Sequence, residues 1–249
     1  MEHLITDLKQ LATDHHIIGM KQSFEDEGVL LKDVITIKRI TELCGLQSFV
    51  KIGGCEAKTD LHNCVNLGVN GIIAPMVETS FALSKFLNII SDYPNKTNSY
   101  IVVESQTAYE NIDQILEASS PLTGIVIGRS DFSKSYGLDK TQVDSDFILQ
   151  KVKDILIKAK KYNLVTTMGG NISVKSSKFI KEMFTKGLLD RIETRNIVIE
   201  LTFDNIDNIN NIIQKSLDFE IKWIEYKLNL LSSLTEAYSS RIELLNNRK

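Results

Sequence analysis

The sequence predicts an α/β protein built as a closed (β/α)8 TIM barrel, and three observations lead to this fold class. Short apolar runs rich in β-branched residues alternate with segments of helical spacing along most of the chain. The runs are apolar throughout, which is typical of parallel strands covered on both faces. Six or seven such units in about 200 residues favour a closed barrel, with an open doubly wound sheet as the alternative.

The elements follow one another in a regular order. Strands are expected at residues 17–24, 48–52, 71–77, 100–104, 124–128, 164–168 and 191–201. Between them, residues 30–43 and 148–162 carry apolar side chains three and four residues apart, which predicts amphipathic helices. The last segment is either one long strand or two short ones with a sharp turn near Arg195. We assign residues 1–205 to the barrel.

Residues 206–249 form a long segment of helical pattern that carries the single tryptophan, Trp223. One barrel does not need this much helix to close. Because an apolar stripe on a projecting helix must be buried, we expect a C-terminal helical extension that packs on a neighbouring subunit of a homo-oligomer. The alternative is packing across the end of its own barrel.

Composition excludes several classes of protein. The 249 residues carry a net charge of -3 without a basic face, which argues against nucleic acid as a partner. No apolar run is long enough for a membrane span, and the N-terminus is too polar for a signal peptide. Cys44, Cys55 and Cys64 are odd in number and lack CxxC spacing. This pattern suits small buried thiols in a reducing compartment, so we expect a cytoplasmic protein that acts on a small molecule.

Two of the expected strands finish on an acid, Glu104 after YIVV and Asp131 after GIVIGRS. In parallel barrels the carboxyl ends of the strands form the active-site mouth. Neighbouring strands are about 4.8 Å apart, so the two side chains can converge on one hard cation. Two carboxylates completed by water and a chelating substrate suit Mg²⁺. The alternative is that each acid caps the helix that follows it.

Three segments form recognisable motifs: APMVET (74–79), VVESQTAYENIDQIL (102–116) and GIVIGRSDFSKSYG (124–137). They resemble the HpcH/HpaI aldolase and citrate lyase β-subunit family of the phosphoenolpyruvate/pyruvate superfamily. The family pattern has a proline-containing strand end, a strand ending in Glu beside an NLDEI-like helix, and an IGPxDLSxxLG motif. The resemblance extends over about residues 48–170 with nearly ungapped spacing.

The resemblance implies a modified TIM barrel that binds Mg²⁺ or Mn²⁺ through Glu104 and Asp131. It also implies making or breaking a carbon–carbon bond beside a 2-oxo acid such as pyruvate, or beside an acyl thioester. The backbone amides of Gly128 to Asp131 become candidates to hold the substrate carboxylate. Family members commonly exchange the last helix between subunits, in agreement with the expectation for residues 206–249.

The sequence departs from the family pattern at several positions. Arg129 stands in place of the usual proline and is followed by Ser130, and an arginine in the mouth can pair with a second carboxylate or a phosphate of the substrate. The histidine of the DGEH-like stretch is absent, and SFEDEG (23–28) stands in its place. Glu25 and Glu27 are therefore the candidate bases, unless this stretch is only a solvated acidic loop.

A catalytic arginine of the family is also absent, and Lys51 in FVKIGG is its nearest counterpart. A lysine carries the same charge without the bidentate fork. Glu193 and Arg195 alternate on a β pattern, so Arg195 is a second candidate to replace the arginine. The alternative for Glu193 and Arg195 is a structural ion pair that closes the barrel.

Paired glycines end two further strands and let the backbone approach a ligand. Gly53 and Gly54 belong to KIGGCE, and Gly169 belongs to TTMGGN, which suits a substrate-facing floor. For the reaction that the resemblance implies, the acid pair and the glycine-rich strand ends favour a metal-dependent lyase that works through a metal-stabilised enolate. A barrel that binds a 2-oxo acid as a sensor or as a subunit of a biosynthetic assembly is the alternative. A third possibility is another reaction of the same enolate, for which Arg129 is the discriminating residue.

Overall fold

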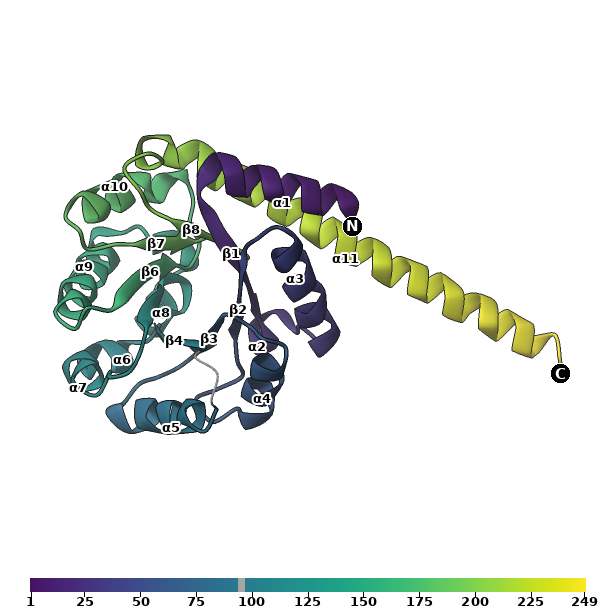
Figure 1. Cartoon of the computed structure of the whole chain (residues 1–249), viewed down its shortest axis with the longest axis horizontal. Coiled ribbons are helices and arrows are strands. Elements are labelled where there is room, and N and C mark those ends of the chain that lie inside the picture. Colours follow the sequence, from purple (N-terminus) through teal and green to yellow (C-terminus); the bar gives the residue numbers. More distant parts are fainter. Residues whose placement is uncertain (94–96) are drawn as a thin grey trace.

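Eight strands form a closed barrel in the order β1 to β8 (Figure 1). A computed structural model describes residues 1–93 and 97–249, apart from the side chains of Asp26 and Glu27. The strands are β1 Ile17–Ser23, β2 Gln47–Lys51, β3 Gly71–Ala74, β4 Asn98–Val103, β5 Gly124–Gly128, β6 Val165–Gly169, β7 Arg191–Glu193 and β8 Ile197–Glu200. The predicted TIM-barrel class is confirmed.

The barrel is modified where it closes. Neighbouring strands from β1 to β7 pair in parallel, but β8 runs antiparallel to both β7 and β1. The segment 191–201 is therefore two short strands joined by a sharp turn at residues 194–196, the second of the two readings of that segment. No crossover helix fits in three residues, so the last strand has to return in the opposite direction.

Helices surround the barrel, and α3, α9 and α11 lie where the sequence pattern predicts helices. They are α1 Glu2–His15, α2 Phe24–Glu27, α3 Leu31–Leu43, α4 Lys58–Asn66, α5 Ser80–Ser91, α6 Gln106–Glu110, α7 Ile112–Glu117, α8 Arg129–Ser135, α9 Asp146–Lys160, α10 Ser177–Thr185 and α11 Ile209–Asn246. Short 3-10 turns occupy η1 Lys140–Gln142, η2 Val174–Ser176 and η3 Ile206–Asn208. In the described part of the chain, none of these helices has the length and apolar character that crossing a membrane requires.

The barrel has two apolar clusters. The larger one lies between the strands and the surrounding helices, where each strand contributes its outward side chains. The smaller one fills the interior with Phe49, Ile73, Tyr100, Val102, Val126 and Val198. Gly71 makes room for the Phe49 ring, because a Cβ at this glycine would lie 2.4 Å from that ring. The lower interior is therefore packed, and space for a ligand remains at the carboxyl ends of the strands.

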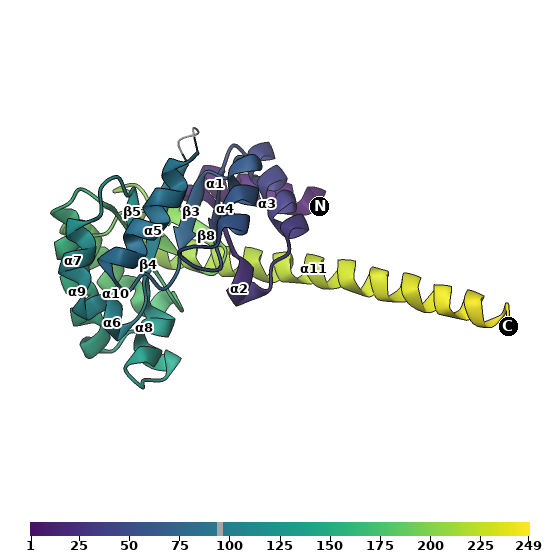
Figure 2. The ribbon, with the colours of Figure 1, turned by 90° about the horizontal axis from the view of Figure 1, so that it is seen from below.

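Helix α11 is 38 residues long and has two unlike halves. Its first half packs on the body, with buried side chains from Ile209 to Trp223, and lies against α1, where Lys222 pairs with Asp7 at 2.6 Å. Its second half extends away from the body and ends far from the barrel (Figures 1 and 2).

Candidate functional site at the carboxyl ends of the strands

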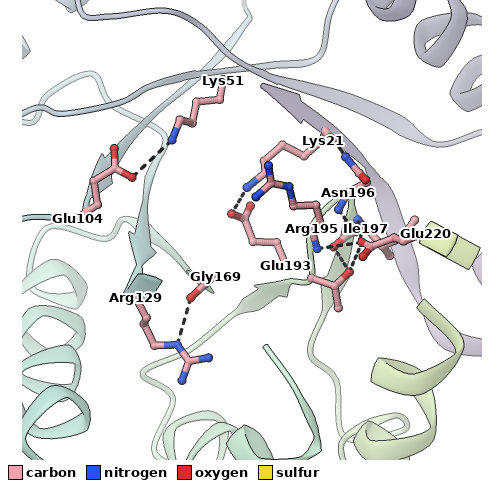
Figure 3. Close-up of polar contacts among 11 residues, drawn as sticks. Lys21, Lys51, Glu104, Arg129, Gly169, Glu193, Arg195, Asn196, Ile197 and Glu220 are labelled. Atoms are coloured by element: carbon pink, nitrogen blue, oxygen red, sulfur yellow. Dashed lines mark hydrogen bonds and ion pairs between the residues drawn. The ribbon is translucent and has the colours of Figure 1, made fainter. Parts of the chain in front are cut away.

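A cavity of about 480 Å³ opens at the carboxyl ends of the strands. Its wall contains carboxylates, ammonium groups and a guanidinium group from separate strands and loops. Seven of the predicted site residues line it: Lys51, Glu104, Gly128, Ser130, Asp131, Glu193 and Arg195. Figure 3 shows Lys51 with Glu104 on one side and Glu193 with Arg195 on the other. The arrangement has the composition of a site for an anionic, chelating small molecule.

Glu104 directly follows β4 and is 4% exposed. One carboxylate oxygen, Oε1, accepts a hydrogen bond from the Met76 backbone amide at 3.1 Å, and Oε2 lies 3.5 Å from the Lys51 ammonium. Burial raises the pKa of Glu104, while Lys51 and the Met76 amide act in the opposite direction. Glu104 is not a helix cap, because Ser105 fills that role for α6 by accepting the Ala108 amide at 3.1 Å. Its carboxylate faces the cavity.

Asp131 is the third residue of α8, and its side chain is half exposed. The N-cap of this helix is Gly128, so Asp131 does not occupy the cap position either. The Asp131 charge contributes to the raised pKa of Glu104, which reflects the approach of the two acids within one cavity. Gly128 permits this approach, since a Cβ there would lie 3.0 Å from Oε2 of Glu104. Lys134 pairs loosely with Asp131 at 3.8 Å.

This pair of carboxylates fits a Mg²⁺-type cation better than zinc. Among the described residues, no group of three or more His, Cys, Asp or Glu side chains has metal-ligand spacing. Mg²⁺ does not need such a cage, because it keeps several waters and is held by one or two carboxylates together with its substrate. A buried carboxylate whose pKa is raised by desolvation also gains from a nearby cation. The donor set is therefore compatible with the predicted Mg²⁺ or Mn²⁺.

Lys21 is a cavity residue that the sequence analysis missed. It belongs to β1 and forms an ion pair with Glu193, the last residue of β7, across the cavity. Glu193 and Arg195 both line the cavity, and Glu193 pairs with Lys21; an ion pair of Glu193 with Arg195 was the alternative considered from the β pattern. A charged residue inside the apolar run IIGMKQS was the available signal, because a buried lysine requires an acidic partner.

Arg195 lies in the turn between β7 and β8, is exposed, and lines the cavity. Its turn is held by Glu220 of α11. The Oε1 atom of Glu220 accepts hydrogen bonds from the backbone amides of Arg195, Asn196 and Ile197 and from the Thr194 hydroxyl (Figure 3). The C-terminal helix thereby fixes one wall of the cavity.

The prediction that Arg129 faces the mouth is wrong. Its side chain is fully buried, and its guanidinium donates to the carbonyl oxygens of Gly169 and Gly170 at 3.1 and 3.0 Å. It also pairs with Asp144 at 2.5 Å and donates to the Ser176 hydroxyl. Burial lowers the pKa of Arg129, and Asp144 opposes this effect. In Figure 3 this side chain points away from the other cavity charges, so it joins loops and does not meet a substrate.

The remaining candidates lie beside the cavity. Glu25 is exposed and close to Gly53, where a Cβ would lie 2.9 Å from Oε1 of Glu25. The Gly53 amide donates to Asp60 at 2.8 Å, and Gly54 faces open space. These three residues are outside the cavity lining. The Glu27 side chain lies outside the described residues.

Gly169 lies under the Glu193 carboxylate, which a Cβ there would approach to 2.6 Å. The absence of a side chain at Gly169 therefore leaves room for the Glu193 carboxylate at the cavity wall. Its neighbour Gly170 lines the cavity wall itself.

The closed barrel with charged side chains at its carboxyl-end cavity defines the class of the protein, a TIM barrel with a candidate active site at the mouth. Within this class, the family model for HpcH/HpaI aldolase/citrate lyase matches residues 5–178. The chain belongs to this family.

Solved structures share the fold at low identity. The citrate synthase SbnG has 15% identity and a TM-score of 0.65, with 89% of this chain and 90% of that chain covered. An HpcH/HpaI aldolase from Desulfitobacterium hafniense DCB-2 has 12% identity and a TM-score of 0.62, covering 76% and 81%. A family protein from Burkholderia cenocepacia J2315 has 13% identity and a TM-score of 0.61, covering 77% and 84%. Comparison with curated proteins gives no match.

Proposed function

We propose that this family member is a divalent-metal-dependent carbon–carbon lyase that acts on a 2-oxo acid unit through an enolate. The observation that carries the proposal is the convergence of Glu104 and Asp131 on one cavity, with the Lys51 ammonium 3.5 Å from Glu104. Glu104 and Asp131 would hold Mg²⁺ or Mn²⁺. When bound, such a cation supplies positive charge that polarises the 2-oxo carbonyl of the substrate.

The proposed reaction is a retro-aldol cleavage. In a 4-hydroxy-2-oxo acid, the hydroxyl loses its proton and the bond between C3 and C4 breaks. The electron pair of that bond passes to C3 and on to the C2 oxygen, giving an aldehyde and an enolate. The enolate then takes a proton at C3 and leaves as the 2-oxo acid. Condensation runs through the same events in reverse.

Lys51 and Lys21 supply fixed positive charge for the developing enolate oxygen. Both ammonium groups line the cavity, and their side chains are only 14% and 15% exposed. A charge held in such a partly desolvated place stabilises an oxyanion more than the same charge would in water. Arg195 adds a third cation on the opposite wall.

We assign proton transfer to Glu193, held by Lys21. The candidate base Glu25 is not favoured, because it lies outside the cavity lining, and the side chain of the second candidate, Glu27, lies outside the described residues. Glu193 lies at the cavity wall with a 5% exposed side chain, and its ion pair with Lys21 fixes its orientation. A carboxylate in this position can receive the hydroxyl proton of the substrate and return a proton to C3.

The alternative is a barrel that binds a 2-oxo acid without turning it over, as a sensor or as a subunit of a biosynthetic assembly. The observation in its favour is that no histidine is among the described residues that line the cavity. Both proposals need the same cation and the same 2-oxo acid, so binding alone does not separate them. Turnover does.

The test is calorimetric titration of the metal-stripped protein with Mg²⁺ and Mn²⁺, with and without oxalate or pyruvate. Glu104→Gln and Asp131→Asn are the site variants. Asp113→Asn is the matched control, because Asp113 is an exposed acid that pairs with Lys158 away from the cavity. We expect wild type and the control to bind the cation more tightly with oxalate, and both site variants to lose binding.

A screen of aldehyde acceptors with pyruvate then separates the two proposals. Product formed by wild type and abolished in Glu104→Gln supports the lyase, whereas cation and oxalate binding without product supports the sensor. If wild type binds neither the cation nor oxalate, both proposals fail.

A further inference from the structure

Four aromatic side chains form a continuous row outside the cavity lining, on the side of the barrel where α6, α8 and α9 lie (Figures 1 and 2). Each ring meets the next edge to face, at centroid distances of 6.1, 5.4 and 5.2 Å, in the order Tyr109 of α6, Phe132 and Tyr136 of α8, and Phe147 of α9. Such contacts are favourable, because the positive edge of one ring meets the negative face of another. We name these four residues the aromatic row.

The ammonium of Lys151, on α9, lies against three rings of the aromatic row. Its Nζ atom is 4.4 Å from the Tyr109 centroid and 4.9 Å from the centroids of Tyr136 and Phe147. All three distances are within the about 6 Å at which a ring face attracts a cation. Among the described residues, no acid pairs with this ammonium, so the ring faces are its partners. One charge therefore contacts side chains from α6, α8 and α9 at once.

The aromatic row joins the two helices that follow the acids of the candidate site. Glu104 lies two residues before α6, and Asp131 is the third residue of α8. The first contact of the row joins these same two helices. Beside it, the backbone amide of Gln106 donates to the Ser135 hydroxyl at 2.8 Å. The separation of the two acids therefore depends on how α6 and α8 pack against each other.

Helix α8 needs this support because it has only seven residues. A helix of that length is not stable by itself in water. The buried Arg129 side chain anchors its beginning, while Phe132 and Tyr136, one turn apart, hold the rest through the aromatic row. Asp131 lines the cavity. A shift or rotation of α8 would move this carboxylate relative to Glu104.

We propose that Lys151 is a positioning residue for Asp131: its ammonium holds the aromatic row together and thereby fixes Asp131 relative to Glu104. This inference rests on the proposed function, in which the two acids hold a divalent cation. Two carboxylates share a cation only when their oxygens keep the required separation, so a loosened α8 weakens binding although no ligand is lost. Lys151 itself lies outside the cavity lining.

The charge of Lys151 has a role that its volume alone does not fill. Methionine has a similar length and would keep the dispersion contacts with the rings, but it lacks the attraction between a cation and a ring face. Arginine keeps that attraction, because a guanidinium also stacks on aromatic faces. Lys151→Met and Lys151→Arg therefore separate the effect of charge from the effect of volume.

The experiment measures the affinity for Mn²⁺ in the presence of oxalate by calorimetric titration. We expect Lys151→Met to bind about 10-fold more weakly than wild type, at the lower end of the loss that follows removal of a group supporting a metal ligand. Lys151→Arg should recover most of this affinity. Lys153→Met is the matched control and should bind as wild type does, because Lys153 lies on the same helix but pairs with Glu182 at 3.7 Å.

A double-mutant cycle tests whether Lys151 acts through the rings. Tyr136→Leu removes one ring and keeps an apolar side chain. If the ammonium and the ring act as one unit, Lys151→Met/Tyr136→Leu should bind Mn²⁺ no more weakly than the weaker of the two single variants. Losses that simply add would contradict the inference.

Hydrogen exchange in the absence of any added cation separates this inference from the proposed function. We expect the amides of residues 133–136 to exchange faster in Lys151→Met than in wild type or Lys153→Met, while the strand amides keep their protection. If wild type binds no Mn²⁺, the proposed function fails, and this difference in exchange still supports the positioning of α8 by Lys151. Equal exchange in all three proteins, or an unchanged Mn²⁺ affinity in Lys151→Met, would overturn the inference.

Discussion

The Glu220 carboxylate of α11 accepts a hydrogen bond from the Arg195 backbone amide at 2.9 Å, which ties the C-terminal helix to the turn between β7 and β8. Two further backbone amides and one hydroxyl donate to the same oxygen. Of the three turn residues, Thr194 donates its amide to the Ile197 carbonyl at 3.0 Å, while the amides of Arg195 and Asn196 are satisfied by the Glu220 carboxylate. The long helix is therefore part of the cavity wall as well as an appendage.

Replacing Glu220 by alanine should destabilise the protein by about 2–4 kcal/mol, because several buried donors would lose their acceptor. Glu225→Ala on the same helix is the control, since Glu225 is exposed and its loss should cost less than about 0.5 kcal/mol. Urea unfolding curves of both variants measure the difference. Equal urea midpoints for Glu220→Ala and Glu225→Ala would show that the turn is stable without the Glu220 carboxylate.

Lys51→Met should lower kcat by about 10²–10³ with little change in KM, as expected for a charge used mainly in the transition state. Lys51→Arg should recover part of the loss, because it keeps the charge with a different geometry. Steady-state kinetics on an active substrate pair from the lyase screen provide the measurement. An unchanged kcat in Lys51→Met would remove Lys51 from the proposed machinery.

Arg129→Ala should destabilise the protein by about 3–5 kcal/mol, since it removes the charged partner of Asp144 and the donor to two loop carbonyls. Arg129→Lys should recover only part of this stability, because an ammonium cannot reproduce the five-donor fork. Thermal unfolding measures both. If Arg129→Ala instead raised KM and left the melting temperature unchanged, the result would support a role for Arg129 in substrate binding.

Gly170→Ala should be strongly destabilising. Gly170 has φ of +78°, and a Cβ there would lie 2.5 Å from the backbone nitrogens of Arg129 and Ser130. Gly54→Ala is the control, because a Cβ at Gly54 meets no atom within 4 Å. We expect a loss of about 2–3 kcal/mol for Gly170→Ala and a change near zero for Gly54→Ala, by urea unfolding. Similar losses in the two variants would contradict this account.

The Cys64 thiol should resist alkylation in the folded protein. It is fully buried, and burial raises its pKa to about 12. At pH 8 about one molecule in 10⁴ would carry the thiolate, which is the reactive form. Cys44 and Cys55 are half-buried and should be modified first. Mass spectrometry after iodoacetamide treatment, with and without urea, tests the order; early modification of Cys64 would contradict it.

The barrel could be predicted because each strand is an uninterrupted apolar run, and this property is local. Glu104 directly follows β4, so its position could be predicted from where an apolar run stops, whereas Asp131 lies in the first turn of α8, three residues after the end of β5. The reversal of β8 was left open by the sequence, because a turn near Arg195 is compatible with either direction until the length of the connection is known.

The interaction partners of the buried charged residues were harder to predict from the sequence. Lys21 and Glu193 are 172 residues apart and meet only because the barrel closes. Arg129 is only two residues before Asp131 in the sequence, yet its side chain contacts Asp144 and the Gly169 carbonyl. Neighbouring positions in a helix point in different directions, so adjacency along the chain does not show which residue reaches the mouth.

The Lys51 ammonium beside Glu104 gives the site a resident counter-ion. A buried carboxylate without a nearby positive charge destabilises the folded state. In many metal sites the metal ion supplies that charge, so the protein folds only when the metal binds. Here the lysine already provides the compensating charge from within the chain. If the proposed metal site is present, the barrel would assemble first and take up the cation later, so treatment with a chelator should leave a folded protein that can bind the cation again.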